Sequence, residues 1–462
     1  MTISASNLDV KAIVARQRAF FATGQTKELN FRLTQLKKLA ELIQENEKVI
    51  LDALYADLRK PPIEAYSGEV LITLSDLKYA LKHLKNWVKP QKVPTPMTLF
   101  PSSSRIYTEP LGVVLIIAPW NYPFSLIIQP LIGAIAAGNC AVLKPSEYTP
   151  HTSKAIAKLV NANFDANFIT AIEGGVETSQ ALLNEKFDCI FFTGSVAIGK
   201  IVMEAAAKHL TPVTLELGGK SPCIVDGDCD LEVTARRIIW GKFYNAGQTC
   251  VAPDYVLVPK SIKAALLEKL LKYVREFYGE NPQQSPDFAR IVNHQQFDRL
   301  VSLLDEDNIL IGGARDRDDL YLAPTLIDRV SPNAKVMADE IFGPILPILE
   351  YEQLDEAIAF VNAKPKPLAL YFFSNDKQTQ ARVLRDISFG GGCLNDTLLH
   401  FGSPELPFGG VGNSGIGSYH GKASFDTFSH RKSILNNSFR FDLKWRYPPY
   451  KMTLETLKKF LK

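Results

Sequence analysis

An apolar strand leads directly into a glycine loop and a helix at Cys189-Ile190-Phe191-Phe192-Thr193-Gly194-Ser195-Val196-Ala197-Ile198-Gly199-Lys200-Ile201. The loop nearly matches a phosphate-binding P-loop, but Ile201 stands where that loop needs a Ser or Thr for magnesium. The free N–H groups at the start of the helix still favour an anion, and a dinucleotide pyrophosphate fits better than a triphosphate. A tight turn without a ligand is the alternative interpretation of the loop taken alone.

Short apolar runs recur on both sides of this stretch, separated by amphipathic segments of helix length. They predict strands at 113–118, 141–144, 168–172, 189–193 and 213–217. Five strands alternating with helices indicate a parallel, doubly wound sheet. A second α/β series follows, with strands expected near 255–258, 368–373 and 391–394. Before the sheet, helical spacing covers 27–58 and 66–87, and a Pro- and Ser-rich connector over 90–104 leads to a strand at 104–108.

Composition and charge exclude several classes of protein. A chain of 462 residues with 46% apolar and 22% charged residues is typical of a globular protein of two or three domains. A net charge of +3 is too small to indicate a protein that binds nucleic acid. Six cysteines without a C-x-x-C pair predict a reducing, cytoplasmic setting. The seven histidines lack metal-ligand spacing, so no metal site is expected.

One uncharged segment, 111–143, resembles a membrane span. Pro119, Pro123 and Pro130 interrupt it, which indicates a buried strand, a buried helix and a second strand instead of a spanning helix. The first nine residues show neither a basic nor an apolar region of a secretory signal. The sequence therefore predicts a soluble chain.

A second glycine pattern, Gly410-Val411-Gly412-Asn413-Ser414-Gly415, satisfies the dinucleotide fingerprint G-x-G-x-x-G. That fingerprint carries meaning only between a first strand and its helix, whereas this copy follows the whole sheet. A loop whose glycines adopt positive φ is therefore the preferred interpretation.

Three polar or reactive residues stand out from their surroundings. Cys250 follows a small-residue stretch, unlike Cys189 inside its apolar strand, which makes it the candidate nucleophile, although most cysteines are inert. Glu216 ends a strand, where ligands of parallel sheets gather, with a solvated strand-end glutamate as the alternative. Asn121 is the odd polar group of the uncharged segment, and its alternative role is to cap a helix starting near Phe124.

Six motifs, in family order and spacing, resemble those of the aldehyde dehydrogenase superfamily. They are Pro119-Trp120-Asn121-Tyr122-Pro123, Leu143-Lys144-Pro145-Ser146-Glu147, Phe192-Thr193-Gly194-Ser195, Leu215-Glu216-Leu217-Gly218-Gly219-Lys220, Gly247-Gln248-Thr249-Cys250 and Glu340-Ile341-Phe342-Gly343-Pro344. The resemblance covers residues 105 to about 431. The short N-terminus and Arg446-Tyr447-Pro448-Pro449-Tyr450 resemble the class 3 branch, whose members act on fatty and aromatic aldehydes.

The resemblance implies catalysis by a thiol. Cys250 would attack the aldehyde carbonyl, which requires that its pKa fall from about 8.5 or that a neighbouring base take the proton. The Asn121 side-chain amide and the Cys250 N–H would hold the oxyanion, and one such donor is worth about 3–4 kcal/mol of barrier. Glu216 would act as general base for the water that hydrolyses the thioester. Lys220 is expected beside the glycine turn, with its role left open.

The resemblance also implies a nicotinamide cofactor. Lys144 and Glu147 would contact the adenosine ribose, and Ser195 would contact the pyrophosphate. The adjoining Thr193 and Gly194 would also bind the cofactor. Glu340 and Phe342 would contact the nicotinamide ribose. A carboxylate at Glu147 accepts a hydrogen bond from a ribose 2′-hydroxyl and repels a 2′-phosphate, so NAD is expected to be preferred, with NADP as the alternative because of Lys144.

An apolar tunnel is expected for the substrate. Trp240 and Tyr244 are i, i+4 neighbours that would line it together with Tyr122, and Leu398, Leu399 and Phe401 resemble a loop that closes it. Ordinary core packing is the alternative for the aromatic pair. The class 3 resemblance implies medium- and long-chain aliphatic, aromatic or polyene aldehydes.

The resemblance implies an α/β fold of two doubly wound parallel-sheet domains with a small β element that bridges subunits. The expected divisions are a Rossmann-like cofactor domain (1–88 and 107–217), a catalytic thiol domain (218–410), the bridging element (89–106 and 411–440) and a tail (441–462). A homodimer is expected. The short, basic, amphipathic tail is predicted to pack on protein, with peripheral contact to anionic lipid as the alternative.

Two other functions stay open on the sequence. One is a coenzyme A-acylating relative, against which the retained Glu216 argues. The other is a non-catalytic structural protein on the same fold, which would be expected to have lost Cys250, Glu216 or Asn121.

Overall fold

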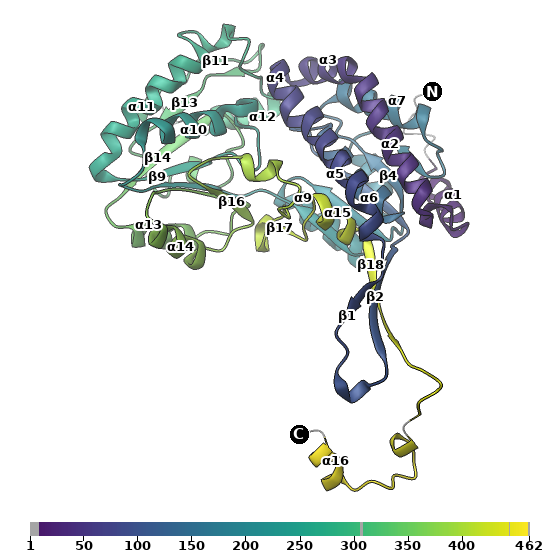
Figure 1. Cartoon of the computed structure of the whole chain (residues 1–462). Helices are drawn as coiled ribbons and strands as arrows, with labels where there is room; N and C mark the ends of the chain where they lie inside the picture. The colour runs from purple at the N-terminus through teal and green to yellow at the C-terminus, as the bar shows by residue number, and fades with distance from the viewer. Residues whose placement is uncertain (1–8, 305–307, 443, 461–462) are drawn as a thin grey trace.

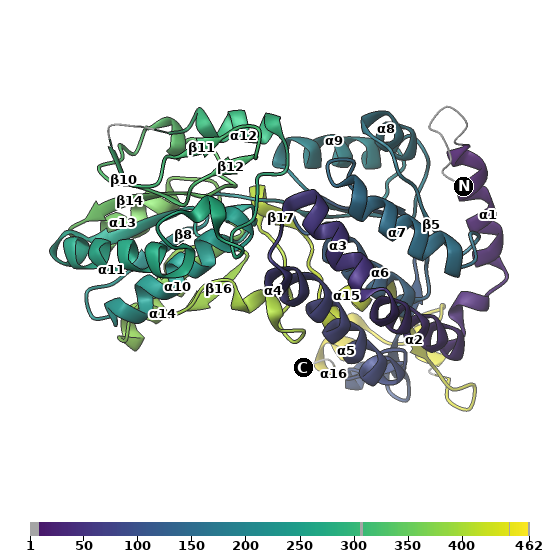
Figure 2. The same cartoon turned by 90° about the horizontal axis from the view of Figure 1, so that it is seen from above.

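The computed structural model describes residues 9–304, 308–442 and 444–460. Its main body has two α/β lobes side by side (Figures 1 and 2). A thin arm, built on a three-stranded sheet, projects from one of them (Figure 1). Among the described residues, no helix is both long and apolar enough to cross a bilayer.

The first lobe is built on a six-stranded sheet of order β17-β7-β6-β3-β4-β5. Its strands are β3 (Val113–Ile117), β4 (Cys140–Lys144), β5 (Ile169–Ala171), β6 (Cys189–Thr193), β7 (Val213–Glu216) and β17 (Gly415–Ile416). The five consecutive strands are parallel, as predicted, and only the edge strand β17 is antiparallel. The intervening helices are α6 (Ser125–Ala137), α7 (Pro150–Asn163), α8 (Val176–Leu183) and α9 (Val196–Ala207).

The N-terminal helices cover this sheet. They are α1 (Val10–Ala22), α2 (Leu29–Glu45), α3 (Glu47–Leu58), α4 (Pro62–Ala65), a π-helical segment η3 (Tyr66–Leu71) and α5 (Ile72–Trp87). Helices α2 and α5 pack on α6, and α3 packs on α7. Every residue of α6 is buried, because one side of this uncharged helix meets the sheet and the other meets these helices. The predicted strand, helix and strand of 111–143 are therefore confirmed.

The second lobe contains a seven-stranded sheet of order β10-β13-β14-β9-β8-β15-β16. All its neighbours are parallel except β10, and a two-stranded ribbon of β11 and β12 lies apart. The strands are β8 (Pro222–Val225), β9 (Tyr255–Pro259), β10 (Ile309–Ile311), β11 (Arg315–Asp316), β12 (Tyr321–Leu322), β13 (Thr325–Ile327), β14 (Ile345–Tyr351), β15 (Ala369–Phe373) and β16 (Gly391–Leu394). The helices include α10 (Leu231–Phe243), α11 (Lys260–Tyr278), α12 (His294–Val301), α13 (Leu354–Asn362) and α14 (Lys377–Asp386).

The arm is an antiparallel sheet of order β1-β2-β18, made from β1 (Gln91–Val93), β2 (Ser103–Pro110) and β18 (Ser429–Asn436). It joins segments more than 300 residues apart, since Ser429 pairs with Pro110 and Asn436 with Ser103. The predicted α/β class with two parallel sheets and a small β element is confirmed. Strand β2 runs across the boundary expected at 106, and the segment 411–440 supplies both β17 and β18.

Candidate active site

Cys250 sits on a tightly held loop that follows α10. The helix ends at Phe243, and the chain reverses through Asn245, Ala246 and Gly247, whose φ values are 54°, 51° and 74°. A Cβ on Gly247 would lie 2.3 Å from the carbonyl oxygen of Gly343, so only glycine fits there.

The Gln248 side chain locks the same loop. Its amide nitrogen donates to the carbonyls of Asn245 and Arg290 at 3.1 and 2.9 Å, and its oxygen accepts from the Val292 N–H at 3.0 Å. Cys250 is thus presented from a backbone that is fixed on several sides.

Two cavities meet at Cys250. The larger, of about 580 Å³, is lined by residues of both lobes, among them Asn121, Thr193, Gly194, Ser195, Glu216, Glu340 and Phe342. The smaller, of about 210 Å³, is apolar and is lined by Tyr122, Trp240, Tyr244, Leu398, Leu399 and Phe401, among others. A thiol at this junction can react with a group that arrives from either side.

The carboxyl ends of three adjacent strands supply the first-lobe side of the larger cavity. Asn121 follows β3, Thr193 ends β6 and Glu216 ends β7. Thr193 and Glu216 are register partners, and the Gly194 N–H donates to the Glu216 carbonyl at 3.0 Å. The glycine loop and the candidate base therefore occupy neighbouring positions, at the end of the sheet where α/β proteins bind ligands.

Glu216 is buried instead of solvated, so the alternative of a solvated strand-end glutamate is wrong. Its side chain is 2% exposed, and neither carboxylate oxygen has a hydrogen-bond partner among the described residues. Loss of hydration raises its pKa well above the ordinary value. An unpaired buried carboxyl that lines a cavity is suited to exchanging a proton with a bound molecule.

Glu340 is a second carboxyl at the cavity. Loss of hydration, followed by the charge of Asp254, raises its pKa to about 8, and a hydrogen bond from the Gly219 backbone opposes the shift. A Cβ on Gly218 would lie 2.0 Å from Glu340 Oε2, so the glycine turn makes room for this side chain.

The Cys250 thiol has a raised pKa. Loss of hydration is the main cause, and Glu340 and Glu216 add to it, while the backbone N–H groups of Cys250 and Val251 oppose it. Of the two routes to a thiolate, a resting thiol with a lowered pKa is therefore disfavoured. Transfer of the proton to a neighbouring base is the route that this arrangement supports.

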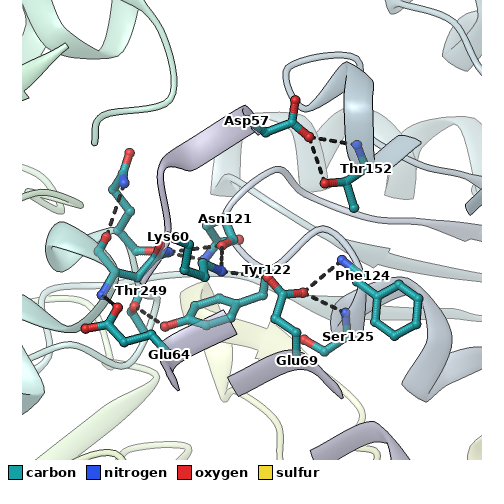
Figure 3. Close-up of polar contacts among 12 residues, drawn as sticks. Asp57, Lys60, Glu64, Glu69, Asn121, Tyr122, Phe124, Ser125, Thr152 and Thr249 are labelled. Atoms are coloured by element: carbon teal, nitrogen blue, oxygen red, sulfur yellow. Dashed lines mark hydrogen bonds and ion pairs between the residues drawn. The ribbon is translucent and has the colours of Figure 1, made fainter. Parts of the chain in front are cut away.

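Asn121 is buried, with its amide held by the cysteine loop. Its Nδ2 donates to the Gln248 carbonyl at 3.0 Å, which leaves the second N–H of the amide for another acceptor. Asn121 does not cap α6, as the alternative role required. Glu69 does so instead, because its Oε2 accepts the N–H groups of Phe124 and Ser125, both at 2.9 Å (Figure 3).

The residues expected at the cofactor fall into two groups. Thr193, Gly194, Ser195, Glu340 and Phe342 line the larger cavity. Ser195 is exposed at the N-cap of α9, where its Oγ accepts from the Ile198 N–H at 3.4 Å.

Lys144 ends β4 and Glu147 follows it, but neither is among the residues lining that cavity. Lys144 Nζ contacts Glu147 Oε2 and the Pro145 carbonyl, both at 2.9 Å. Lys144 is buried and Glu147 is exposed, so the acidic group faces solvent.

The larger cavity has the chemistry of a nicotinamide dinucleotide site. Thr193 Oγ1, both Glu216 oxygens and Glu340 Oε1 are buried without a partner among the described residues. The N-terminus of α9 adds free N–H groups and the positive end of a helix dipole. Unpaired hydroxyl and carboxyl groups suit ribose and amide donors, and the helix end suits a pyrophosphate.

The six residues expected at the substrate tunnel all line the smaller cavity. The Tyr122 and Tyr244 hydroxyls are turned to protein partners, Thr249 Oγ1 and Ser67 Oγ, each at 2.8 Å. Trp240 meets Tyr244 edge to face with ring centroids 5.5 Å apart. With the phenol groups satisfied elsewhere, the surface left for a ligand is apolar.

Two buried lysines near the site could not be interpreted from the sequence: the role of Lys220 was left open, and Lys242 was not singled out. Lys220 pairs with Asp254 at 2.5 Å and donates to the carbonyls of Val336 and Asp339. Lys242 is fully buried on α10 without a partner among the described residues, and burial lowers its pKa to about 8.

The second glycine pattern forms a loop beside Glu216. Gly412 has φ of 64° and Gly415 has φ of 157°, and Gly415 pairs with Glu216 across β17 and β7. The prediction of positive-φ glycines at this loop is confirmed.

Comparison with known proteins identifies the family. The model of the "Aldehyde dehydrogenase family" matches residues 2–434. The 4,4'-diaponeurosporen-aldehyde dehydrogenase of Staphylococcus aureus is 56% identical, over 96% of this chain and 97% of that protein. Aldehyde dehydrogenase family 3 member A2 of Macaca fascicularis is 50% identical, over 94% and 90%. The dimeric NADP-preferring aldehyde dehydrogenase of Mus musculus is also 50% identical, over 96% and 98%.

Solved structures agree with these relatives. A substrate-bound structure of Staphylococcus aureus AldH superposes with a TM-score of 0.96 at 54% identity, covering 98% of this chain and all of that one. The predicted resemblance to the class 3 branch, and with it the prediction of an NAD(P)-dependent enzyme, is confirmed. The chain belongs to the aldehyde dehydrogenase family.

Proposed function

We propose that the chain oxidises apolar medium- and long-chain aliphatic, aromatic or polyene aldehydes to carboxylic acids with NAD(P)+. The observation that carries the proposal is the position of Cys250 between an apolar cavity and a polar one. The aldehyde enters the apolar side, and the dinucleotide occupies the polar side. The relative named 4,4'-diaponeurosporen-aldehyde dehydrogenase supports an apolar polyene substrate.

The chemistry runs through the thiol. Cys250 Sγ bonds to the aldehyde carbon while its proton passes to a neighbouring carboxylate. The carbonyl oxygen becomes an oxyanion held by Asn121 Nδ2 and the Cys250 N–H. A nicotinamide held beside Glu340 and Phe342 would supply the acceptor for the hydride that leaves the aldehyde carbon. Glu216 then removes a proton from the water that attacks the resulting thioester, so that the acid leaves and the thiol is restored.

A panel of aldehydes tests this function. We expect kcat/KM to rise from a two-carbon to an eight-carbon aldehyde, because each buried CH₂ is worth about 0.8 kcal/mol. Cys250→Ala should abolish aldehyde-dependent NADH formation and leave NAD binding intact. A flat chain-length profile contradicts the apolar substrate, and turnover by Cys250→Ala contradicts the whole assignment.

The same aldehydes, assayed with coenzyme A added, distinguish a carboxylic acid product from an acyl-CoA product. Formation of acyl-CoA would favour the coenzyme A-acylating alternative. The buried Glu216 argues against that alternative, because it can act as the base for hydrolysis of the thioester. NAD is proposed as the preferred cofactor because of the Glu147 carboxylate, and equal or faster turnover with NADP at matched concentrations would contradict that preference. One relative is named NADP-preferring, which makes this comparison informative.

We also propose a cytoplasmic homodimer. The six cysteines are free thiols, which suits a reducing compartment. The β18 edge of the arm is open in a single chain and carries exposed Ile434 and Leu435. The tail helix α16 (Leu454–Phe460) lies beyond the arm (Figure 1). Residues 443, 461 and 462 of the predicted tail lie outside the described part of the chain.

A further inference from the structure

A fully buried ion pair lies behind the loop that carries Asn121. Lys60 Nζ and Glu69 Oε1 are 2.6 Å apart, and both side chains are 0% exposed. Lys60 follows α3 and Glu69 lies in the π-helical segment η3. Both therefore come from the N-terminal helical region and not from the lobe that carries Cys250. Removing two charges from water is costly, and apolar residues of similar volume often stabilise a protein as well or better. Stability alone is a weak reason for this pair.

The pair holds the Asn121 loop at both ends. Lys60 Nζ donates to the Asn121 carbonyl at 3.0 Å. Glu69 Oε2 accepts the N–H groups of Phe124 and Ser125, at the first turn of the 13-residue helix α6. The whole segment 121–125 is therefore tied to one ion pair, as Figure 3 shows.

Lys60 also contacts the middle of the loop. Its Nζ lies 4.1 Å from the centroid of the Tyr122 ring, within the range of a cation–π interaction. Tyr122 in turn contacts Thr249, the residue before Cys250, through the 2.8 Å hydroxyl pair. The buried ammonium thus has three partners, and two of them, the Asn121 carbonyl and the Tyr122 ring, belong to the Asn121 loop.

The helices that carry the pair are themselves anchored. Asp57 accepts the N–H and hydroxyl of Thr152 at 2.7 Å each, which links the end of α3 to the first turn of α7. Glu64 Oε2 accepts the Asn245 N–H at 2.8 Å, and Asn245 Nδ2 donates to the Asn121 carbonyl at 3.0 Å. The carbonyl of Asn121 therefore receives two donors, Lys60 and Asn245, which Glu69 and Glu64 hold in place.

We propose that Lys60, clamped by Glu69, is a positioning residue for the oxyanion hole. It holds the Asn121 peptide so that the free N–H of the side-chain amide faces the oxygen of the aldehyde bound to Cys250. The proposal rests on the proposed function, since it assigns that oxygen to Asn121. Misplacement of a catalytic group by about 1 Å can cost roughly 10²-fold in rate.

The test is a double-mutant cycle on kcat. Lys60→Met should lower kcat by about ten- to one hundred-fold, with the KM for NAD changed less than about two-fold. Asn121→Ala should lower kcat by roughly 10²–10³. In the Asn121→Ala background, Lys60→Met should change kcat by less than about two-fold, because the group that it positions is gone.

Two further variants separate positioning from folding. Asp57→Asn weakens the same helical segment at α7 without touching the Asn121 loop, so it should lower the Tm and leave kcat near that of the wild type. Lys60→Met/Glu69→Gln leaves no unpaired buried charge and keeps an amide oxygen for α6, so it carries the test if the single variant does not fold. It should show the same fall in kcat as Lys60→Met.

The outcomes are distinguishable. Unchanged kcat in Lys60→Met or in the double variant, or effects of Lys60 and Asn121 that simply multiply, would overturn the positioning role. A wild-type chain that does not oxidise aldehydes, or an active Cys250→Ala variant, would instead overturn the proposed function itself.

Discussion

At the scale of single residues, the site is defined by ionisable groups kept away from water. Cys250, Glu216 and Glu340 all have raised pKa values, chiefly because they are poorly hydrated. A raised pKa keeps the Cys250 thiol neutral at rest and makes each glutamate carboxylate a stronger base than an ordinary one. The arrangement therefore suits transfer of the thiol proton to a neighbouring carboxylate.

Replacement of Glu216 isolates one proton transfer. Glu216→Gln should keep a single burst of about one NADH per site and slow steady-state turnover by about 10²–10⁴-fold, because only thioester hydrolysis needs this base. The carboxylate is the active form and its pKa is raised, so the hydrolysis rate of the wild type should rise with pH and that of the variant should not. Rapid mixing across a pH series measures both. Loss of the burst, or full steady-state activity, would contradict the assignment.

At the scale of secondary-structure elements, the sequence patterns did not predict two kinds of feature: strands that contain proline, and a turn in which non-glycine residues have positive φ. Strands β8 and β14 contain Pro222 and Pro347, and proline normally argues against a strand, so this part of the second sheet was not predicted. Asn245 and Ala246 have positive φ, but neither is a glycine, so the sequence does not indicate this conformation. They end α10 at Phe243, so Tyr244 reaches the cavity from just beyond the helix and not from within it.

Gly247 offers a stability test at this scale. Gly247→Ala should unfold the chain or lower its Tm severely, since the new Cβ meets the Gly343 carbonyl oxygen at 2.3 Å. Gly24 is a matched control, because its φ of 80° lies in the same left-handed region and a Cβ there would meet nothing within 4 Å. Gly24→Ala should cost only about 1–2 kcal/mol, the strain of a left-handed alanine. Equal Tm values for the two variants, measured by thermal unfolding, would show that the collision is relieved.

At the scale of the whole molecule, the arm is the feature that a single chain leaves incomplete. Its residues after Ser429 are almost all exposed, and β18 forms an open edge. Open edges of this kind are normally covered or paired, so a second copy is the proposed partner.

The proposed dimer can be checked by sedimentation. The wild-type chain should sediment at twice 51.4 kDa. Ile434→Lys/Leu435→Lys should shift it toward the monomer, because charges replace apolar side chains at the edge. Val176→Lys, at a residue 64% exposed on α8, should leave the mass unchanged. A monomeric wild-type chain would contradict the proposal.

A second sedimentation experiment tests the tail. If the chain sediments with anionic vesicles and a variant without residues 451–462 does not, the lipid-binding alternative for the tail is favoured.

Much of the fold and the site followed from local pattern. Alternation of apolar strands and amphipathic helices specifies a parallel sheet, because each element must bury one face whatever its neighbours are. The motifs around Asn121, Glu216 and Cys250 mark the residues that meet at the cavities, since reactive side chains occur in short runs with the turns that present them.

Other properties depend on which distant segments come together. Burial of Glu216 and the raised pKa of Cys250 arise only when two lobes exclude water from the same space. Lys60 and Glu69 look like ordinary charges of an amphipathic helical region, and only the tertiary structure places both of them inside the protein, against Asn121 and the first turn of α6. Hydration and charge pairing are properties of three-dimensional surroundings, so a linear pattern cannot specify them.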